Sequence, residues 1–467
     1  MDVDQALGFP LTRLPLDVIE PILCRVESRR DLVSFAATSI ACKTLVIPRH
    51  TEYRTLRVRD RPEVWAHLAQ RPDLSRNIRE VIIRGTSPMK SCSQPERYPV
   101  TWVDAASQSD PPETIIANMC EALRNMDNLR SFTWICAWNP SGLYVHLPHY
   151  HASVFQVLKD SKSLVRFKMV DKMALGTLST GPVAEEEYPL WHIANLQSLF
   201  IRPLEWWPKG MNSLLLRSPN LQALDIRLPN DGSSVFTSCS FPQLRRLNLN
   251  STGSSSEREV IQFLQNHPTI QDLRWYPHND ELQLGHGSLP NLKTLITSPE
   301  IACSVLADPT VPNRVIECVS QLSITDATLA ILDAIDTSRL RDLRVWRYSG
   351  LETINRLAEL FPNLTRLEVP KFGIPTRDDT ENENYTIDDY ILTLSKFRCL
   401  EYLLDSAIWP MLLLDSEKIT SLAIRCPNLQ RLGHYNSGKS QYVDIVFRRE
   451  GREVLWTEET AEKEWHS

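Results

Sequence analysis

The residue types that most often perform chemistry, histidine and cysteine, occur in this chain without the spacing of a reactive site. The densest group is His146, His149 and His151, in the stretch HLPHYH. Imidazole is a common zinc ligand, but no cysteine or carboxylate adjoins these histidines to complete a ligand set. Because Pro148 interrupts the stretch, we interpret it as a surface loop and not as a metal site.

Other catalytic patterns are missing as well. The ten cysteines are scattered and form no CxxC pair, which argues against a zinc site or a thioredoxin-type redox centre. The sequence contains no GxSxG, HExxH, P-loop or GxGxxG motif, and its 15 glycines leave little material for a phosphate-binding loop. We therefore predict that the protein is not an enzyme and that it has no catalytic residue, no metal and no cofactor. Its function must lie in surfaces.

Composition narrows the choice of partner. The chain has 467 residues and a net charge of -6, so it carries no polybasic footprint and we expect no nucleic-acid partner. The start, MDVDQALGFP, is acidic, and no stretch approaches the length of a membrane span, so we expect no secretion and no membrane contact. Scattered cysteines without a signal peptide indicate reduced thiols in the cytoplasm, the nucleus or both.

Most of the chain follows one repeated pattern: an apolar residue, two of any kind, an apolar residue, one of any kind, and a third apolar residue. Its spacing averages about 29 residues, at the upper end of the range for leucine-rich repeats. Full copies begin at Tyr53, Ile78, Leu129, Leu164, Leu196, Leu221, Leu244, Ile270, Val319, Leu340 and Leu364, and shortened copies begin at Leu292, Leu400 and Leu429. Each copy predicts a strand.

Helices are expected between these strands. Pro-Asn-Leu leads into the pattern at 219–221, 290–292, 362–364 and 427–429, and a proline at that place ends a helix before the next strand. One repeat buries too few side chains to offset its own ordering entropy, so neighbouring repeats must stack. We predict an α/β leucine-rich-repeat solenoid with a parallel sheet over residues 53–435, which resembles the leucine-rich-repeat proteins.

The residues before the repeats differ from the rest. Val18, Ile19, Ile22, Leu23 and Val26 form one stripe of a helix that Asp17 can cap. Ser28 is the candidate cap of a second helix, and a third, roughly 40–47, should end before the next proline. Residues 12–50 are thus predicted to form a small all-α module, which is too small to fold without a neighbour.

These residues also carry a family resemblance. Leu14-Pro15, Val18-Ile19, Ile22-Leu23, Val26, Asp31-Leu32 and Phe35 resemble an F-box, which commonly precedes leucine-rich repeats. The resemblance implies a substrate-recognition subunit of a Skp-cullin-F-box ubiquitin ligase, which binds a Skp-family adaptor and, through it, a cullin and a RING protein. The residues that it implies for contact or support are Leu14, Pro15, Val18, Ile19, Ile22, Leu23, Leu32 and Phe35.

An alternative remains open. Cys42 and Thr38 stand where the family usually has Trp and Val, so the helices could instead serve only as the cap of a leucine-rich-repeat scaffold or inhibitor that acts outside ubiquitination. A docking module must leave the Ile22 side of the first helix available, whereas a cap buries it against the Tyr53 repeat.

The repeats themselves offer a surface for a protein target. Side chains alternate along a strand, so the residues that flank the second and third apolar positions should line the inner side of the solenoid. Basic residues outnumber acidic ones there, and we hypothesise an acidic or phosphorylated protein partner. The alternative is a solvated face that neighbouring acids balance. The candidate target-binding residues are Arg202, Arg227, Arg246, Arg274, Tyr276, Arg344 and Trp346.

Two segments stand outside the repeat pattern. Residues 377–389 (RDDTENENYTIDD) form an acidic loop, at whose end Thr386 and Asp389 can cap a helix over 387–396. Residues 436–467 follow the last repeat, and within them 443–447 and 453–456 should pair as a hairpin that covers it.

Overall fold

The computed structural model describes most of the chain. The described residues are 14–26, 28–47, 50–51, 53–58, 61–84, 111–136, 148–171, 187–202, 210–227, 235–250, 257–277, 282–311, 314–333, 339–348, 350–369, 385–405, 408, 412, 415–436, 441–451 and 453–460. They divide into two compact units, Met1–Leu221 and Gln222–Ser467. Within the described ranges, no helix combines the length and apolar character needed to cross a bilayer.

The first unit begins with three short helices and continues as strand–helix repeats. The helices are α1 (Leu16–Arg25), α2 (Arg29–Ala36) and α3 (Ile40–Val46). The repeats comprise β1 (Thr55–Val58), α4 (Pro62–Gln70), α5 (Pro72–Ser75), β2 (Glu80–Arg84), α6 (Pro112–Arg124), β3 (Ser131–Cys136), α7 (Pro148–Asp160), β4 (Arg166–Asp171), the 3-10 helix η5 (Pro189–His192), β5 (Ser198–Arg202) and α8 (Met211–Leu216). Strands β1 to β5 pair in chain order, and all are parallel.

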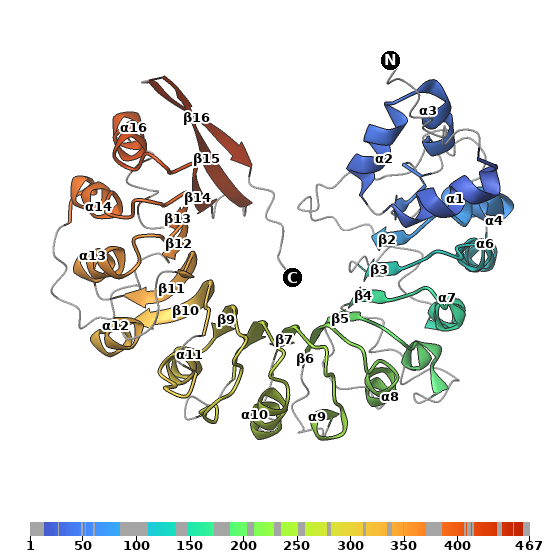
Figure 1. The fold of residues 1–467 in the computed structure, drawn as a ribbon, viewed down its shortest axis with the longest axis horizontal. Coiled ribbons are helices and arrows are strands. Elements are labelled where there is room, and N and C mark those ends of the chain that lie inside the picture. The colour runs from blue at the N-terminus through green and yellow to red at the C-terminus, as the bar shows by residue number, and fades with distance from the viewer. Residues whose placement is uncertain are drawn as a thin grey trace, which may run out of the picture. The chain divides into compact units, whose positions relative to one another are not determined.

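The second unit continues the same alternation. It comprises β6 (Ala223–Arg227), α9 (Val235–Ser238), β7 (Arg246–Asn250), α10 (Glu257–Asn266), β8 (Asp272–Trp275), β9 (Thr294–Thr297), α11 (Pro299–Leu306), β10 (Cys318–Ile324), α12 (Asp326–Asp333), β11 (Asp342–Tyr348), α13 (Leu351–Leu360), β12 (Arg366–Val369), α14 (Ile387–Leu394), β13 (Tyr402–Asp405), α16 (Ser416–Arg425), β14 (Arg431–Asn436), β15 (Gln441–Glu450) and β16 (Glu453–Thr460). Strands β6 to β14 run parallel in chain order, and β15 and β16 close the sheet as an antiparallel hairpin. The helices of this unit lie along one side of its strands (Figure 1).

A strand lies at every copy of the apolar pattern, as the sequence predicted. The middle apolar residues of neighbouring copies stand in register, so that Leu247 pairs with Leu224 on one side and Leu273 on the other. All three are almost completely buried. The copy that begins at Val319 is an exception, because its first apolar residue, Val319, pairs with Leu295 and Leu343. The stacked apolar positions form the continuous core that a single repeat could not supply. The residues are therefore α/β strand–helix repeats, consistent with a repeat solenoid.

The asparagine that precedes the first apolar residue has a structural role of its own. Its side-chain amide donates a hydrogen bond to a carbonyl of the preceding repeat: Asn291 to Pro268 at 3.0 Å, and Asn428 to Arg398 at 2.7 Å. Asn128 makes the same contact with Arg76 at 2.9 Å. These bonds satisfy turn carbonyls and tie neighbouring repeats together.

Some local predictions are confirmed. Thr386 and Asp389 form a reciprocal capping box at the start of α14, which ends at Leu394 and so is slightly shorter than predicted. Ser28 caps α2, and α3 ends at Val46, before Pro48. The hairpin is also confirmed, and its strands are longer than the sequence indicated.

Other local predictions are wrong. His149 and His151 lie in helix α7 and not in a loop, because Pro148 occupies its first residue, where a proline costs no helical hydrogen bond. The N-cap of α1 is Pro15, and Asp17, the predicted cap, lies inside the helix. His146 and most of the acidic loop, residues 377–384, lie outside the described residues.

Candidate protein-docking site

The three N-terminal helices enclose a small core of their own. Its buried members are Ile19, Leu23, Leu32, Ala36 and Val46, and Leu14, Val26, Phe35, Leu45 and Ile47 pack around them. Of the eight residues that the F-box resemblance implied, Leu14, Ile19, Leu23, Leu32 and Phe35 therefore support the core. They hold the helices in place and offer little surface to a partner.

The remaining three residues are exposed. Val18 and Ile22 stand one turn apart on α1 and keep 43% and 42% of their surface in solvent. Pro15, at the start of the same helix, is exposed too. Helix α1 thus has a buried apolar side and a second, uncovered apolar side. We call Val18 and Ile22 the α1 face.

Two further apolar residues of these helices are exposed and were not singled out in the sequence. Val33 on α2 and Ile40 on α3 are exposed like the α1 face. A helical wheel could have indicated Val33, because its neighbour Leu32 is buried in the core and adjacent helical positions point in different directions. Ile40 carries no such signal, since α3 is short.

Buried polar contacts join the helices to the first repeat. The guanidinium of Arg54, just before β1, donates to the carbonyls of Val26 and Leu23, the latter at 2.6 Å. These carbonyls end α1, where the helix dipole favours a cation. His50 Nε2 lies 3.2 Å from Glu20 Oε1, and burial lowers the pKa of His50 although Glu20 opposes the shift. Helix α1, which carries the α1 face, is therefore anchored to the first repeat.

The second candidate surface is the strand face turned away from the helices in the second unit. Arg344 on β11 lies 3.3 Å from Asp342 and 3.6 Å from Glu368 on β12. Arg366 reaches the same Asp342 carboxylate at 3.8 Å, and its guanidinium lies 4.5 Å from the ring centre of Tyr402. We call Asp342, Arg344, Arg366 and Glu368 the charged cluster. Within this cluster the two carboxylates balance the two guanidinium groups.

Burial and the neighbouring carboxylates together shift the pKa values of groups on this face. Although desolvation lowers it, the carboxylates of Asp342 and Glu368 raise the pKa of Arg344 overall, so its guanidinium stays charged. Cys318 stands beside Asp342 in register, and burial followed by that carboxylate raises the pKa of its thiol to about 12. The thiol is therefore protonated and unreactive at neutral pH.

The other candidate target-binding residues are spread along the strands. Burial raises the pKa of the Tyr276 hydroxyl, and the charges of Arg274 on β8 and Arg344 on β11 oppose that shift. Trp346, beyond Arg344 on β11, is exposed. Arg227 and Arg246 lie on β6 and β7, and Arg246 is exposed. Arg202 belongs to the first unit, at the end of β5, with its guanidinium 4.8 Å from the ring centre of Phe200.

The structure also places a cysteine and a histidine in one pocket of about 300 Å³, lined by Cys239 and His267. His267 Nε2 accepts the Phe241 amide at 2.9 Å, which assigns the Nδ1 proton to the Phe263 carbonyl 2.6 Å away. Burial lowers the pKa of His267 and raises that of Cys239. An imidazole with both nitrogens engaged cannot act as a base, so we interpret the pair as structural. The described part of the chain holds no group of three or more potential metal ligands.

The fold and these surfaces define an α/β repeat protein with an exposed apolar helix face. No family model matches the sequence, and no curated protein matches it. A solved structure that it resembles is "Crystal structure of Rad7 and Elc1 complex in yeast", at 12% identity and a TM-score of 0.38, over 90% of this chain and 86% of that one. A likeness at this level leaves function to be argued from the residues.

Proposed function

We propose that the protein is a non-catalytic substrate-recognition adaptor of a Skp-cullin-F-box ubiquitin ligase. The N-terminal helices dock on a Skp-family adaptor, and the repeats hold a protein target. Transfer of ubiquitin belongs to the other subunits, so the adaptor needs no reactive group of its own. Its site of action is the cytoplasm, the nucleus or both, where such ligases work.

The observation that carries this proposal is the α1 face. A helical cap would bury the Ile22 side of α1 against the first repeat, yet Val18 and Ile22 remain 43% and 42% exposed while Ile19 and Leu23 beside them form the core. Apolar side chains at i and i+4 on a fixed helix suit insertion into an apolar groove of a partner. Together with the F-box resemblance, this favours docking over capping alone.

The strand face supports the second half of the proposal. Arg274 on β8 and Arg344 on β11 both act electrostatically on the Tyr276 hydroxyl, and exposed Trp346 follows on the same strand as Arg344. Arginine and large aromatic residues are the types that most often anchor a protein interface. The ion pairs of Arg344 fix its guanidinium before a partner arrives, which lowers the ordering cost of binding.

Co-purification with a Skp-family adaptor tests the first half. The full chain should retain the adaptor, and a double variant Val18→Asp with Ile22→Asp should lose it, because two desolvated carboxylates would oppose groove binding. The matched control is Leu216→Asp on α8, which also replaces an exposed apolar residue of the first unit. That control should bind like the wild type.

Each outcome is decisive. Loss of the adaptor in the double variant, with unchanged circular dichroism, supports the adaptor role. Failure of the intact chain to bind would overturn it and favour a repeat scaffold or inhibitor outside ubiquitination. Equal binding by the wild type and the double variant would show that the α1 face is not the docking surface.

A further inference from the structure

The last described strand of the second unit, β16, has one edge with which no other described strand pairs. Among the described residues, β16 pairs with β15 alone and is the last strand in the order of its sheet. Its eight residues include no proline and no bulge that would block another strand. A row of unpaired N–H and C=O groups at such an edge is a template for strand addition.

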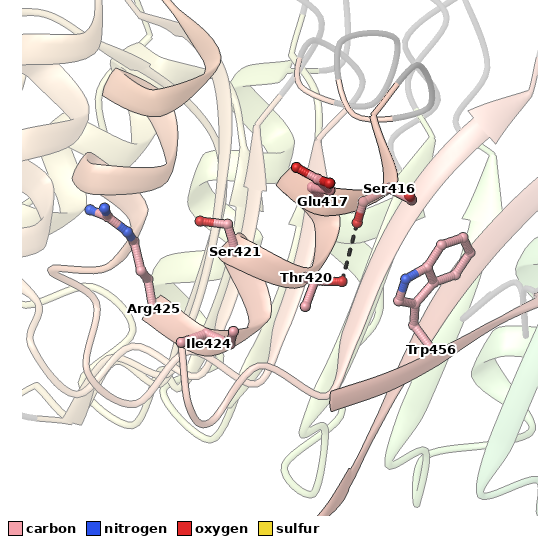
Figure 2. A pocket seen from close by; sticks show the side chains of 7 residues that line it. All are labelled: Ser416, Glu417, Thr420, Ser421, Ile424, Arg425 and Trp456. Carbon is pink, nitrogen blue, oxygen red and sulfur yellow. Dashed lines mark hydrogen bonds between the residues drawn. The ribbon is translucent and has the colours of Figure 1, made fainter. Parts of the chain in front are cut away.

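A groove runs beside this edge, between β16 and helix α16 (Figure 2). It has a volume of about 580 Å³ and is lined by Ser416, Glu417, Thr420, Ser421, Ile424, Arg425 and Trp456. Trp456 faces the helix across the groove, and Ile424 on the helix is 61% exposed. Inside this unit, α14 packs beside α13 and α16 beside α14, whereas no described helix follows α16 and β16 lies beside it instead. The groove is the uncovered flank of the last layer.

The charged residues beside the groove indicate which kind of segment can bind there. Glu453, Glu458 and Glu459 stand on β16, and Glu417 lines the groove. The basic residues nearby are Arg425 in the groove, Arg448, which lies 3.9 Å from Glu459, and Arg449, whose guanidinium already binds three carbonyls around the end of α16. Like charges oppose the pairing of β16 with a second copy of itself and favour a basic strand.

We infer that β16 and the α16 groove form a docking site for an extended, basic segment of a partner protein. The segment adds one strand to the free edge of β16. Its alternate apolar side chains enter the groove between Trp456 and Ile424, and its basic side chains lie near the glutamates of β16. This site is independent of the α1 face, so the inference does not rest on the proposed adaptor role.

Peptide binding to the full-length chain tests the inference. The probe is a fluorescein-labelled ten-residue peptide that alternates valine and lysine, and binding is followed by fluorescence anisotropy. It should bind at least about tenfold more tightly than a peptide that alternates valine and glutamate, a ratio that corresponds to about 1.4 kcal/mol. A lysine and valine peptide with alternate backbone amides N-methylated should also bind about tenfold more weakly, because it cannot donate to the strand edge.

Variants of the chain locate the site. Glu453→Lys with Glu458→Lys should reverse the preference between the lysine and glutamate peptides. Both glutamates are exposed on β16, so the fold should persist. Trp456→Ala with Ile424→Ser should weaken binding of the lysine peptide about tenfold. Leu216→Ser, on a helix of the first unit, is the control and should not change it.

Hydrogen exchange supplies a readout that nonspecific attraction would not give. The lysine and valine peptide should slow exchange of the amides of residues 453–460. Equal binding of the N-methylated peptide, unchanged binding by the groove variant, or no binding at all would overturn the inference. Self-association of the free chain that the charge-reversing variant abolishes would overturn it too, because the occupant would then be a second copy.

Discussion

The two ends of the chain stabilise a run of repeats in different ways. At the N-terminus, three helices enclose a core of their own and leave apolar side chains of α1 exposed. At the C-terminus, two antiparallel strands extend the sheet itself, and Ile445 of β15 continues the row of buried apolar residues next to Leu432. The helical end is a separate small body attached to its repeat, whereas the hairpin is part of the repeat layer.

Both ends use an arginine to hold a helix C-terminus. Arg54 binds the carbonyls of Leu23 and Val26 at the end of α1, and it is buried. Arg449 on β15 reaches the carbonyls of Ala423, Cys426 and Leu429 around the end of α16, at 3.2, 3.1 and 2.8 Å, and it is largely exposed. The same chemistry should therefore matter more at the N-terminal end, because a buried carbonyl that loses its donor has no water to replace it.

The largest expected effect distinguishes the core residues of the helical end from the exposed α1 face. Leu23→Ala should lower the free energy of unfolding of the first unit by about 3 kcal/mol, since it leaves a cavity in a small core. Ile22→Ala, its exposed neighbour, should cost less than about 0.5 kcal/mol. Urea unfolding followed by circular dichroism measures both. Equal losses would mean that Ile22 is also a core residue and that α1 has no free face.

The arginine comparison comes next. Arg54→Met should cost about 2 kcal/mol and Arg449→Met about 1 kcal/mol, because the bond from Arg54 to the Leu23 carbonyl is buried, whereas the bonds of the exposed Arg449 are only partly buried. Hydrogen exchange should rise in α1 for the first variant and in α16 for the second, each relative to the wild type. An effect of Arg449→Met as large as that of Arg54→Met would contradict the argument from burial.

A smaller effect tests the seam between the last repeat and the hairpin. A Cβ at Gly433 would lie 2.6 Å from the Tyr402 hydroxyl oxygen and 2.9 Å from Asp444 Oδ1. Gly433→Ala should therefore lower the melting temperature of the second unit, at a cost of about 1 kcal/mol. Tyr402→Phe in the same chain removes the hydroxyl and should restore part of the loss. If the melting temperature does not recover in the double variant, the Tyr402 hydroxyl is not the group that clashes with the added Cβ.

The smallest effect is pH dependence, which should have opposite signs at the two ends. Burial lowers the pKa of His50, so its folded form resists protonation and the N-terminal end loses stability as pH falls below about 6.5. Burial raises the pKa of Asp444, so its folded form holds a proton more tightly. The C-terminal end therefore loses stability as pH rises from about 3.8 through the folded pKa of Asp444.

Two variants separate these contributions in thermal melts. At pH 7, His50→Gln should melt below the wild type and Asp444→Asn above it. Both differences in melting temperature should shrink as the pH is lowered. Protonation of His50 then destabilises the wild type, and protonation of Asp444 removes the destabilising buried charge. Differences that stay constant with pH would show that neither group titrates differently in the folded and unfolded chain.

Much of the repeat architecture was readable from local pattern. Strand positions followed from the spacing of apolar residues, because every second side chain of a strand must enter the core. The capping box of Thr386 and Asp389 was equally local, since both partners lie within one helical turn. The histidines of α7 were misread because Pro148 suits the first turn of a helix as well as a loop.

What the sequence by itself determined is the order of strands and helices and the set of apolar residues at the N-terminus. Only the tertiary structure decided which of those residues are buried. Ile19 and Leu23 lie in the core, whereas Val18 and Ile22 are exposed. It also decided that Arg344 meets Asp342 and Glu368, and that Trp456 and Ile424 line a groove. The physical reason is that periodicity fixes the direction of a side chain relative to its own element, whereas exposure and ion pairing depend on which other element packs against it.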